Sequence, residues 1–531
     1  MLIQILPDLL TKSYINYPDK AAVFFKNDLM TYSDVYHQSK KLAAYLKDIG
    51  MHKGDRIAIY LEKRFEKVVS IFGTSMAGGV IVPMRRLLYA TQVAHIISDC
   101  RAKILITTSD RLPVFDEIQD QLSSLEYIIV IDGKKEMQEI KSEEFRLIGW
   151  EACLNHKLKY NDDSIVETDL AAILYTSGST GKPKGVVLTH LNIVAGAKKV
   201  SDYLKISQND RLLSILTFAF DYGLNQLTGA FLHGAQIVLL DYLFPADIIK
   251  AVQKYSVTGL AAVATTWIQL LQTSWNQDDV PTLRYITNSG GAIPEFYVRE
   301  LRKRIPQTKI FLMYGLTEAF RSTFLDPDLV DEKPTSMGKA IPGEEILVLD
   351  ENDKPVKMGE VGQLVHRGVL VAQGYWNAPD LTAIRYRPNP IQPKEIPIRE
   401  MVVYSGDNVR IDENGYLYFI GRNDEMIKSA GNRISPTEVE ELLYSSGEIQ
   451  DVVVLGIPHN IYGQIIKAVI VPKNGHVPSI DDLITYCKKM APPYMVPGDF
   501  EFRENLPRNA NGKLDRAKVK KEVYEALNKE I

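Results

Sequence analysis

A short loop that combines hydroxyl groups, glycine and lysine carries the clearest chemistry in this sequence. It reads "TSGSTGKPK" and lies between the apolar runs "AAILY" and "GVVLTH". Glycine lets backbone N–H groups approach an anion closely, so such a loop can surround a polyphosphate without help from a helix. The candidate phosphate-binding residues are Thr176, Ser177, Gly178, Ser179, Thr180, Gly181 and Lys184.

The spacing within this loop excludes a Walker A phosphate loop. In that motif a Ser or Thr follows the lysine and the loop opens a helix. Here Pro183 follows Lys182, and proline lacks an N–H group and disfavours helical backbone at the preceding residue. The structural alternative is a solvated Gly/Ser loop, although two flanking apolar strands favour a binding loop.

The segment "MYGLTEAFRS" contains one acidic residue, Glu318. A nucleotide polyphosphate is bound together with Mg²⁺, a hard cation that takes one or two carboxylates and phosphate oxygens. Glu318 suits that role, with Thr317 beside it, and Tyr314 is placed to stack on a base. The alternative is the start of a helix, with Thr317 and Glu318 as capping residues.

The segment "YSGDNVRIDENGYLYFIGR" reads as a hairpin with its turn at "DENG", bracketed by Asp407 and Arg422. A carboxylate that accepts hydrogen bonds from two vicinal hydroxyl groups is a common way to hold a ribose. The alternative is that Asp407 caps a turn and Arg422 is a surface base.

Near the C-terminal end, "LPRNANGKLDR" has a strong turn signal at "NG", followed by Lys513. Taken alone, Lys513 is better explained as an exposed turn lysine. The occurrence of all four segments in one chain, in this order, is a stronger indication of function than any one of them.

The elements that must position these residues alternate in type. "TYSDVYHQSKKLAAYLKDIG" predicts a helix that starts after cap residues and stops at Gly50. "DRIAIYL", "GGVIVPM", "AKILITTS" and "EYIIVIDG" predict buried strands, with a further helix over 65–77. This rhythm predicts an α/β fold of parallel sheets covered by helices. The last hundred or so residues have their own pattern and predict a small α+β domain.

Composition narrows the function classes. The chain has 531 residues and a formal net charge of -4, which argues against a nucleic-acid binder that relies on bulk charge. Its three cysteines are widely spaced and suggest neither a disulfide framework nor a metal site. The first residues lack the basic start of a signal peptide, and no long apolar run predicts a membrane span. We therefore expect a cytoplasmic protein.

In order and spacing, these segments resemble the adenylate-forming superfamily of acyl-CoA synthetases, peptide-synthetase adenylation domains and luciferase-like enzymes. The resemblance extends from about residue 10 to about residue 520 and includes "GRNDEMIKSAGNRISPTEVE". It implies an enzyme that uses ATP and Mg²⁺ to convert a carboxylic acid into an acyl-adenylate, followed by attack of a thiol and release of AMP.

The resemblance also implies a domain division and further site residues. A large N-terminal domain, 1–423, binds ATP and acid, and a small mobile domain, 424–531, turns about a hinge at Asp424. Lys513 is the catalytic lysine, with Thr317 and Glu318, and Gly431 lies on the thiol channel. Gly290, Gly291 and Ala292 lie behind the adenine, opposite Tyr314.

The acid is less certain from sequence. Phe220 and Asp221 in "TFAFDYGLNQL" resemble the amino-acid-activating branch, in which the Asp holds a substrate ammonium. The alternative is that Asp221 is the N-cap of a helix beginning near Tyr222. Arg321 maps to the acyl pocket and either binds a polar substrate group or pairs with Asp221. A long alkyl chain fits poorly, because two charged residues beside it are costly.

The acceptor is also open. The stretch from Lys513 to Ile531 leaves no room for a carrier domain, so we expect the phosphopantetheine thiol of a separate carrier protein, with free CoA as the alternative. A non-catalytic nucleotide-binding relative is a remote third interpretation, since Lys513, Glu318 and Asp407 occur together.

Overall fold

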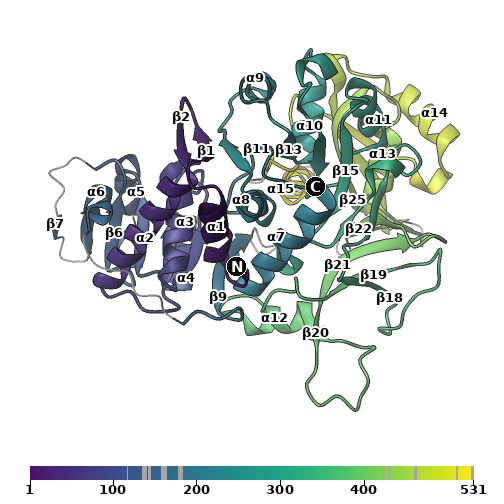
Figure 1. Cartoon of the computed structure of the whole chain (residues 1–531). Helices are drawn as coiled ribbons and strands as arrows, with labels where there is room; N and C mark the ends of the chain where they lie inside the picture. Colours follow the sequence, from purple (N-terminus) through teal and green to yellow (C-terminus); the bar gives the residue numbers. More distant parts are fainter. Residues whose placement is uncertain are drawn as a thin grey trace.

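The computed structural model describes residues 1–116, 118–133, 140–141, 145–156, 164–176, 183–422, 425–429, 432–459, 463–509 and 512–527. Over these ranges the strands form three sheets of 14, 8 and 5 strands. Two large sheets build the N-terminal part and the third belongs to the C-terminal part (Figure 1).

The first sheet joins a parallel half to an antiparallel half. The parallel pairs are β1–β12, β12–β11, β11–β13, β13–β14 and β14–β15. From β15 onward the pairs are antiparallel: β15–β16, β16–β17, β17–β22 and β22–β21. Its strands, in spatial order, are β18 (Glu345–Leu349), β19 (Val361–Arg367), β21 (Met401–Ile411), β22 (Leu417–Arg422), β17 (Ser336–Ala340), β16 (Thr323–Phe324), β15 (Lys309–Tyr314), β14 (Tyr285–Asn288), β13 (Gly259–Ala262), β11 (Arg211–Ser214), β12 (Gln236–Leu239), β1 (Ala21–Phe25) and β2 (Asp28–Thr31), with β20 (Tyr386–Pro388) beside β21.

The second sheet is parallel through its centre, with antiparallel strands at its two ends. Its strands, in spatial order, are β10 (Lys184–Thr189), β9 (Leu170–Thr176), β4 (Val80–Pro83), β3 (Arg56–Ile59), β5 (Ile104–Thr107), β6 (Tyr127–Val130), β8 (Arg146–Gly149) and β7 (Ile140–Lys141). The third sheet contains β24 (Asn432–Ile434), β23 (Ile427–Ser429), β26 (Gly463–Pro472) and β25 (Ile449–His459), with β27 (Asp499–Phe502) beside β26.

Helices cover the faces of the sheets, because the buried strands are apolar on both faces. Those of the N-terminal part are α1 (Leu6–Asn16), α2 (Tyr32–Asp48), α3 (Phe65–Met76), α4 (Ala90–Cys100), α5 (Leu112–Asp116), α6 (Trp150–Leu154), α7 (His190–Leu204), α8 (Asp221–His233), α9 (Pro245–Tyr255), α10 (Ala264–Leu271), α11 (Glu295–Arg304) and α12 (Pro379–Arg385). Those of the C-terminal part are α13 (Pro436–Tyr444), α14 (Ile480–Met490) and α15 (Arg516–Leu527).

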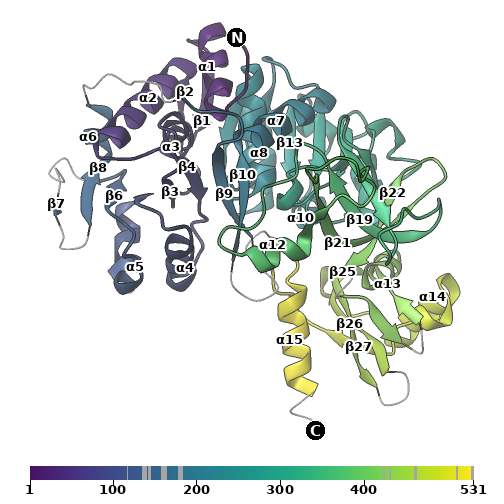
Figure 2. The same ribbon diagram turned by 90° about the horizontal axis from the view of Figure 1, so that it is seen from below.

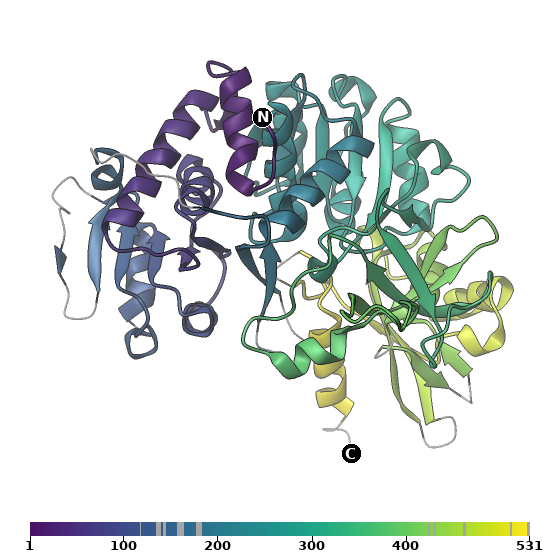
Figure 3. The same ribbon diagram turned by 60° about the horizontal axis from the view of Figure 1, so that its bottom comes forward.

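One apolar core joins the two large sheets through the helices between them. It contains residues of α1, α2, α3, α7 and α8, such as Leu42, Phe72 and Phe231, together with strand residues from both sheets. Figure 3 shows these helices between the sheets. The α2 helix also follows its predicted signals, because the Thr31 side chain accepts a hydrogen bond from the Asp34 N–H and the chain turns at Gly50 with φ of +91°.

The predicted fold class is confirmed, with one difference. The predicted strands and helices of the N-terminal half and of the small α+β domain are present. The expectation of parallel sheets missed most of the antiparallel half of the first sheet, which residues 323–422 form, although the predicted hairpin with its turn at "DENG" is present as β21 and β22. The boundary at 423/424 stays a prediction, and Asp424 lies outside the described residues. No helix within the described ranges is long and apolar enough to cross a bilayer.

Buried side chains of the small domain share one apolar cluster with those of α10 and α11, and Figure 2 shows this domain and α15 at the bottom of the view. The rings of Tyr297 and Tyr444 meet edge to face at 5.8 Å, and the Tyr297 hydroxyl donates to the Ile449 carbonyl oxygen at 3.1 Å. The Thr265 hydroxyl donates to the Gly512 carbonyl oxygen at 2.8 Å. The residue before Lys513 is thereby tied to the N-terminal part.

Candidate active site

The start of α8 and a short 3-10 turn, Thr317–Ala319, form the floor of the candidate site. Asp221 is 1% exposed, and its Oδ1 accepts a hydrogen bond from the Thr317 hydroxyl at 3.0 Å. Burial raises the pKa of the Asp221 carboxyl, and Arg321 and Thr317 oppose that rise. The helix-cap alternative is wrong, because Phe220 is the N-cap residue and Asp221 already lies in the first turn.

Arg321 enters the same cluster and is 2% exposed. Its Nη1 lies 3.6 Å from Asp221 Oδ2 and 3.4 Å from the Ser289 hydroxyl. The guanidinium carbon lies 4.3 Å from the centre of the Tyr222 ring, a cation–π contact. Of the two interpretations of Arg321 from sequence, pairing with Asp221 is the contact that is present.

The backbone before Arg321 is strained. Phe320 has φ of +47°, a region that bulky residues rarely adopt, and its side chain is fully buried. The ring lies against Gly196 of α7, where an added Cβ would lie 2.3 Å from Phe320 Cδ1. A strained backbone held by tight packing is common at functional sites.

Lys513 reaches this cluster from the small domain. Its Nζ lies 5.8 Å from the centre of the Phe220 ring, and a Cβ at Gly290 would lie 3.1 Å from that Nζ. Burial lowers the pKa of the Lys513 amine, and the carboxylates of Asp221 and Asp407 oppose that shift. Lys513 is therefore not the exposed turn lysine that its local sequence favours.

Glu318 is held by a residue that sequence reasoning missed. The Tyr375 hydroxyl donates to Glu318 Oε1 at 2.5 Å, and Lys184 Nζ lies 5.7 Å from the centre of the Tyr375 ring. Glu318 Oε2 has no hydrogen bond to any described residue, which fits one carboxylate ligand of a hard cation. Within the described ranges no group of three His, Cys, Asp or Glu side chains could hold a metal ion.

A second carboxylate cluster joins β15 to the β21–β22 hairpin. Asp407 and Arg422 face each other in register, with Arg422 Nε 3.5 Å from Asp407 Oδ1. The Tyr314 hydroxyl donates to Asp407 Oδ2, and the Tyr314 ring stacks on His366 with centroids 5.9 Å apart. Burial raises the pKa of the Asp407 carboxyl. This arrangement places a flat aromatic ring beside a buried carboxylate.

The predicted adenine-backing segment follows β14. Gly290 has φ of +81°, and the Asn288 amide donates to the Gly291 carbonyl oxygen at 3.0 Å. Gly291 and Ala292 are both exposed, so this short segment presents open backbone. The positive φ favours glycine at 290, where a Cβ would also lie close to the end of the Lys513 side chain, whereas a Cβ at Gly291 would meet nothing within 4 Å.

The phosphate loop is described only at its ends. Thr176 closes β9 and Lys184 opens β10 opposite it. Seven predicted residues lie outside the described residues: Ser177, Gly178, Ser179, Thr180, Gly181, Asp424 and Gly431.

Three contact residues carried no sequence signal. Tyr375 bonds to Glu318 across 57 positions, and Ser289 bonds to Arg321 across 32. Thr265 bonds to Gly512 across 247 positions. None of the three was singled out by a charged or glycine-rich motif, so only the fold reveals them.

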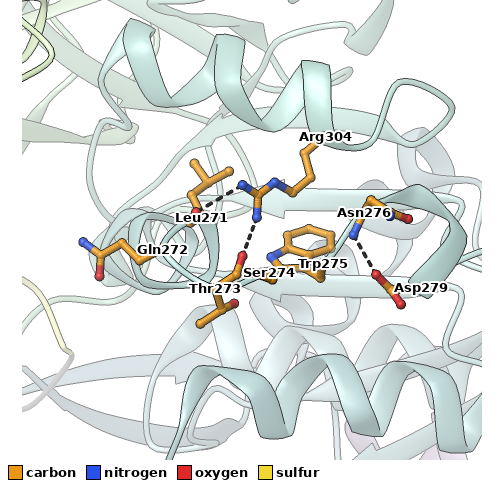
Figure 4. Close-up of a pocket in the computed structure, with 8 residues that line it drawn as sticks. All are labelled: Leu271, Gln272, Thr273, Ser274, Trp275, Asn276, Asp279 and Arg304. Carbon is orange, nitrogen blue, oxygen red and sulfur yellow. Dashed lines mark hydrogen bonds between the residues drawn. The ribbon is translucent and has the colours of Figure 1, made fainter. Parts of the chain in front are cut away.

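A separate polar pocket lies at the end of α10 (Figure 4). Arg304 donates to the carbonyl oxygens of Thr273 and Leu271 there, and its guanidinium lies 5.6 Å from the centre of the Trp275 ring. No predicted site residue lines this pocket.

Curated relatives are of two kinds. Over 506 residues the chain is 31% identical to a linear gramicidin synthase component from Brevibacillus parabrevis, covering 94% of this chain but 6% of that synthase component. Over 544 residues it is 28% identical to a long-chain-fatty-acid–CoA ligase of Bacillus subtilis (strain 168), covering 98% of this chain and 95% of that ligase.

Solved structures share the fold across the whole chain. The anthranilate CoA ligase AuaEII in complex with anthranoyl-AMP superposes with a TM-score of 0.88 at 24% identity, covering 99% of both chains. ATP-bound MatB from Rhodopseudomonas palustris superposes with a TM-score of 0.85 at 23% identity, covering 98% of this chain and 99% of that one.

Two family models match the chain, one over its N-terminal part and one over its C-terminal part. Residues 10–376 match the family described as AMP-binding enzyme, and residues 438–513 match the AMP-binding enzyme C-terminal domain. Both matches agree with the resemblance seen in the motifs and with the shared fold. The chain therefore belongs to the AMP-binding enzyme family and is an AMP-forming acid–thiol ligase that uses ATP with Mg²⁺.

Proposed function

We propose that this ligase adenylates a small polar carboxylic acid and transfers the acyl group to a phosphopantetheine thiol. In the first step a carboxylate oxygen attacks the α-phosphorus of ATP, and pyrophosphate leaves. In the second step the thiol sulfur attacks the acyl carbon, and AMP leaves. One observation carries the proposal: Lys513 belongs to the small domain, yet its side chain lies beside Gly290 and Phe220 of the N-terminal part.

We assign the nucleotide to the clusters around Asp407 and the phosphate loop. Asp407 binds the ribose hydroxyl groups, with Arg422 beside it, and the Tyr314 ring packs against the adenine opposite the 290–292 backbone. Thr176, Lys184 and the loop between them hold the phosphates. Glu318 holds the magnesium ion, which neutralises phosphate charge when it is bound.

The chain's own residues stabilise charge in the first step. Attack of a weak carboxylate nucleophile builds negative charge on the phosphate, so catalysis depends on positioning and on fixed positive charge. Lys513 supplies that charge from a flexible stem, in a buried setting where electrostatic interactions are strong. Thr317 fixes the Asp221 carboxylate, and through it the floor of the acid site.

The acid class follows from the polar floor beneath Phe220. Asp221 and Arg321 are both buried there, and an alkyl chain beside them would offer no acceptor to Nε and Nη2 of Arg321, which lack hydrogen-bond partners among the described residues. We therefore propose a small polar acid. An amino acid, with its ammonium on Asp221, is the second candidate, favoured by the similarity to a peptide synthase.

For the second step we propose a separate carrier protein as the source of the thiol. Free CoA is the second candidate, favoured by a CoA ligase that aligns over 95% of its own length. Both present the same phosphopantetheine arm, so the same channel past Gly431 would serve either. We further propose that the small domain turns about Asp424 between the two steps.

ATP–pyrophosphate exchange with a panel of acids tests the adenylation. Exchange that depends on one class of small polar acid supports the proposal, and exchange restricted to long-chain fatty acids contradicts it. Transfer from the purified acyl-adenylate to CoA or to a phosphopantetheinylated carrier protein then identifies the acceptor. Transfer to neither thiol would refute the second step.

A further inference from the structure

Arg321 is a buried cation that its surroundings satisfy only in part. Its Nη1 uses the Ser289 hydroxyl and the Asp221 carboxylate, at 3.4 Å and 3.6 Å. Nε and Nη2 are buried and have no hydrogen-bond partner among the described residues. Buried polar groups in proteins are nearly always paired, and an unpaired donor on a charged group is costly.

The two unpaired nitrogens share one edge of the guanidinium. Nε and Nη2 direct parallel N–H bonds to the same side, a rigid fork that suits a planar oxygen acceptor. The opposite edge carries Nη1 and its contacts.

The neighbours of Arg321 place this fork at the acid end of the site. Asp221, Ser289 and Tyr222 contact the guanidinium, whereas the proposed ribose carboxylate, Asp407, pairs with Tyr314 and Arg422. Lys513 interacts electrostatically with both Asp221 and Arg321. An acceptor for the fork therefore belongs to the acid, close to the carboxylate that Lys513 serves.

We infer that the acid activated by this enzyme carries a second oxygen, in a carbonyl or hydroxyl group near its carboxylate, which Nε and Nη2 of Arg321 bind. This inference rests on the proposed adenylation. It deepens that proposal by naming the substrate class as oxo or hydroxy acids.

Charge balance selects a neutral oxygen over the alternatives. The Asp221 carboxylate is already opposed by the Arg321 guanidinium, so a substrate ammonium would face a cation. A second carboxylate would leave an excess of negative charge in a buried site. A carbonyl or hydroxyl oxygen fills the fork and leaves the pair neutral.

Pyrophosphate exchange with matched acids tests the inference. Each set shares one carbon skeleton: the unsubstituted acid, its 2- or 3-oxo and hydroxy forms, and its 2-amino form. The measured quantity is the ratio of kcat/KM between the oxygenated and unsubstituted acids. We expect a ratio of about 10 to 100 for the wild type, the scale of a hydrogen bond to a charged group.

Variants assign that ratio to Arg321. Arg321→Met should bring it toward 1, and Arg321→Lys, which keeps the charge but loses the fork, should leave only part of it. Arg304→Met is the control, because it removes a guanidinium that also lies over an aromatic ring but outside the site (Figure 4), and it should retain the wild-type ratio. If melting curves show that Arg321→Met is unfolded, Arg321→Lys decides.

Four outcomes overturn the inference. These are a wild-type preference for the unsubstituted acid, a preference for the 2-amino acid, exchange without preference, and a ratio that survives both Arg321 variants. Absence of exchange with every acid overturns the proposed adenylation itself, whereas exchange without preference overturns only the role of the fork.

Discussion

Replacing Gly196 with alanine should disturb the site from a distance. The added Cβ would lie 2.3 Å and 2.5 Å from two ring carbons of Phe320, where carbon atoms normally stay about 3.5–4.0 Å apart. The Phe320 ring is fully buried and has little room to yield. Its strained backbone leads directly into Arg321, so movement of the ring should move the guanidinium.

The size of the effect follows from two opposing terms. Alanine in a helix is better than glycine by about 1 kcal/mol, whereas overpacking a core costs about 1–3 kcal/mol. Gly229 of α8 is a matched control, because its Cβ would meet only Ile206 Cδ1, at an ordinary 3.6 Å. Gly229→Ala should be neutral or stabilising, and Gly196→Ala should be less stable than it by about 1–3 kcal/mol.

Thermal melting and pyrophosphate exchange measure the two parts of this prediction. We expect Gly196→Ala to melt below Gly229→Ala and to raise KM for the acid while leaving KM for ATP unchanged. If the two variants melt together, the close contact between Gly196 and Phe320 is wrong. If Gly196→Ala melts early but keeps its KM for the acid, Phe320 does not position Arg321.

Three further predictions concern Lys513, Glu318 and the domain interface. Lys513→Ala should slow adenylation by about 10²–10³-fold yet still transfer the acyl group from pre-formed acyl-adenylate in single-turnover assays; equal loss in both steps would contradict a role confined to adenylation. Glu318→Gln should raise the Mg²⁺ concentration needed for half-maximal exchange without lowering the melting temperature, and an unchanged Mg²⁺ dependence would count against Glu318 as the ligand. Glu441 Oε2 accepts a hydrogen bond from the Glu295 N–H at 3.3 Å between the two domains, and burial raises the pKa of Glu441 to about 7. The Glu441 carboxyl binds its proton more tightly when the domains are docked, so ionisation of Glu441 should weaken docking as pH rises from about 4.5 to about 7, by up to about 3 kcal/mol. Across that window the melting temperature of Glu441→Gln should fall less than that of the wild type. Melting temperatures that fall in parallel with pH in both proteins would refute the assignment.

The fold was predictable because its signals are local. Alternating apolar runs and capped helices specify the parallel strands and their helices, and the Thr31 cap and the Gly50 stop hold as expected. In the antiparallel half of the first sheet, the hairpin of β21 and β22 was predicted, because its two strands are adjacent in sequence. Pairs such as β17 with β22 were missed, because these strands lie far apart in the chain. Pairing over such distances depends on the rest of the fold and leaves little trace in periodicity.

The candidate site was only partly open to prediction from sequence. The pairing of Arg321 with Asp221 was one of two alternatives that the sequence left open, whereas the approach of Lys513 to this pair depends on contacts that no pattern encodes. The direction of Arg321 depends on φ of +47° at Phe320, a state that residue propensities disfavour. The position of Lys513 depends on how the small domain docks, and the local turn signal pointed the other way.

The docking contacts are of two kinds, and both bear on the proposed rotation of the small domain. The apolar contacts between the domains are non-directional, so a rotation could exchange them for others. The hydrogen bond from Thr265 to the Gly512 carbonyl oxygen is directional and sets the place of Lys513. Such a bond contributes only about 0.5–1.5 kcal/mol, and moving a two-state equilibrium from 1:99 to 99:1 takes about 5.5 kcal/mol. On the proposed mechanism, a few polar contacts of this size would hold Lys513 in place for adenylation, and the change from acid and ATP to acyl-adenylate would have to offset them before the domain could turn.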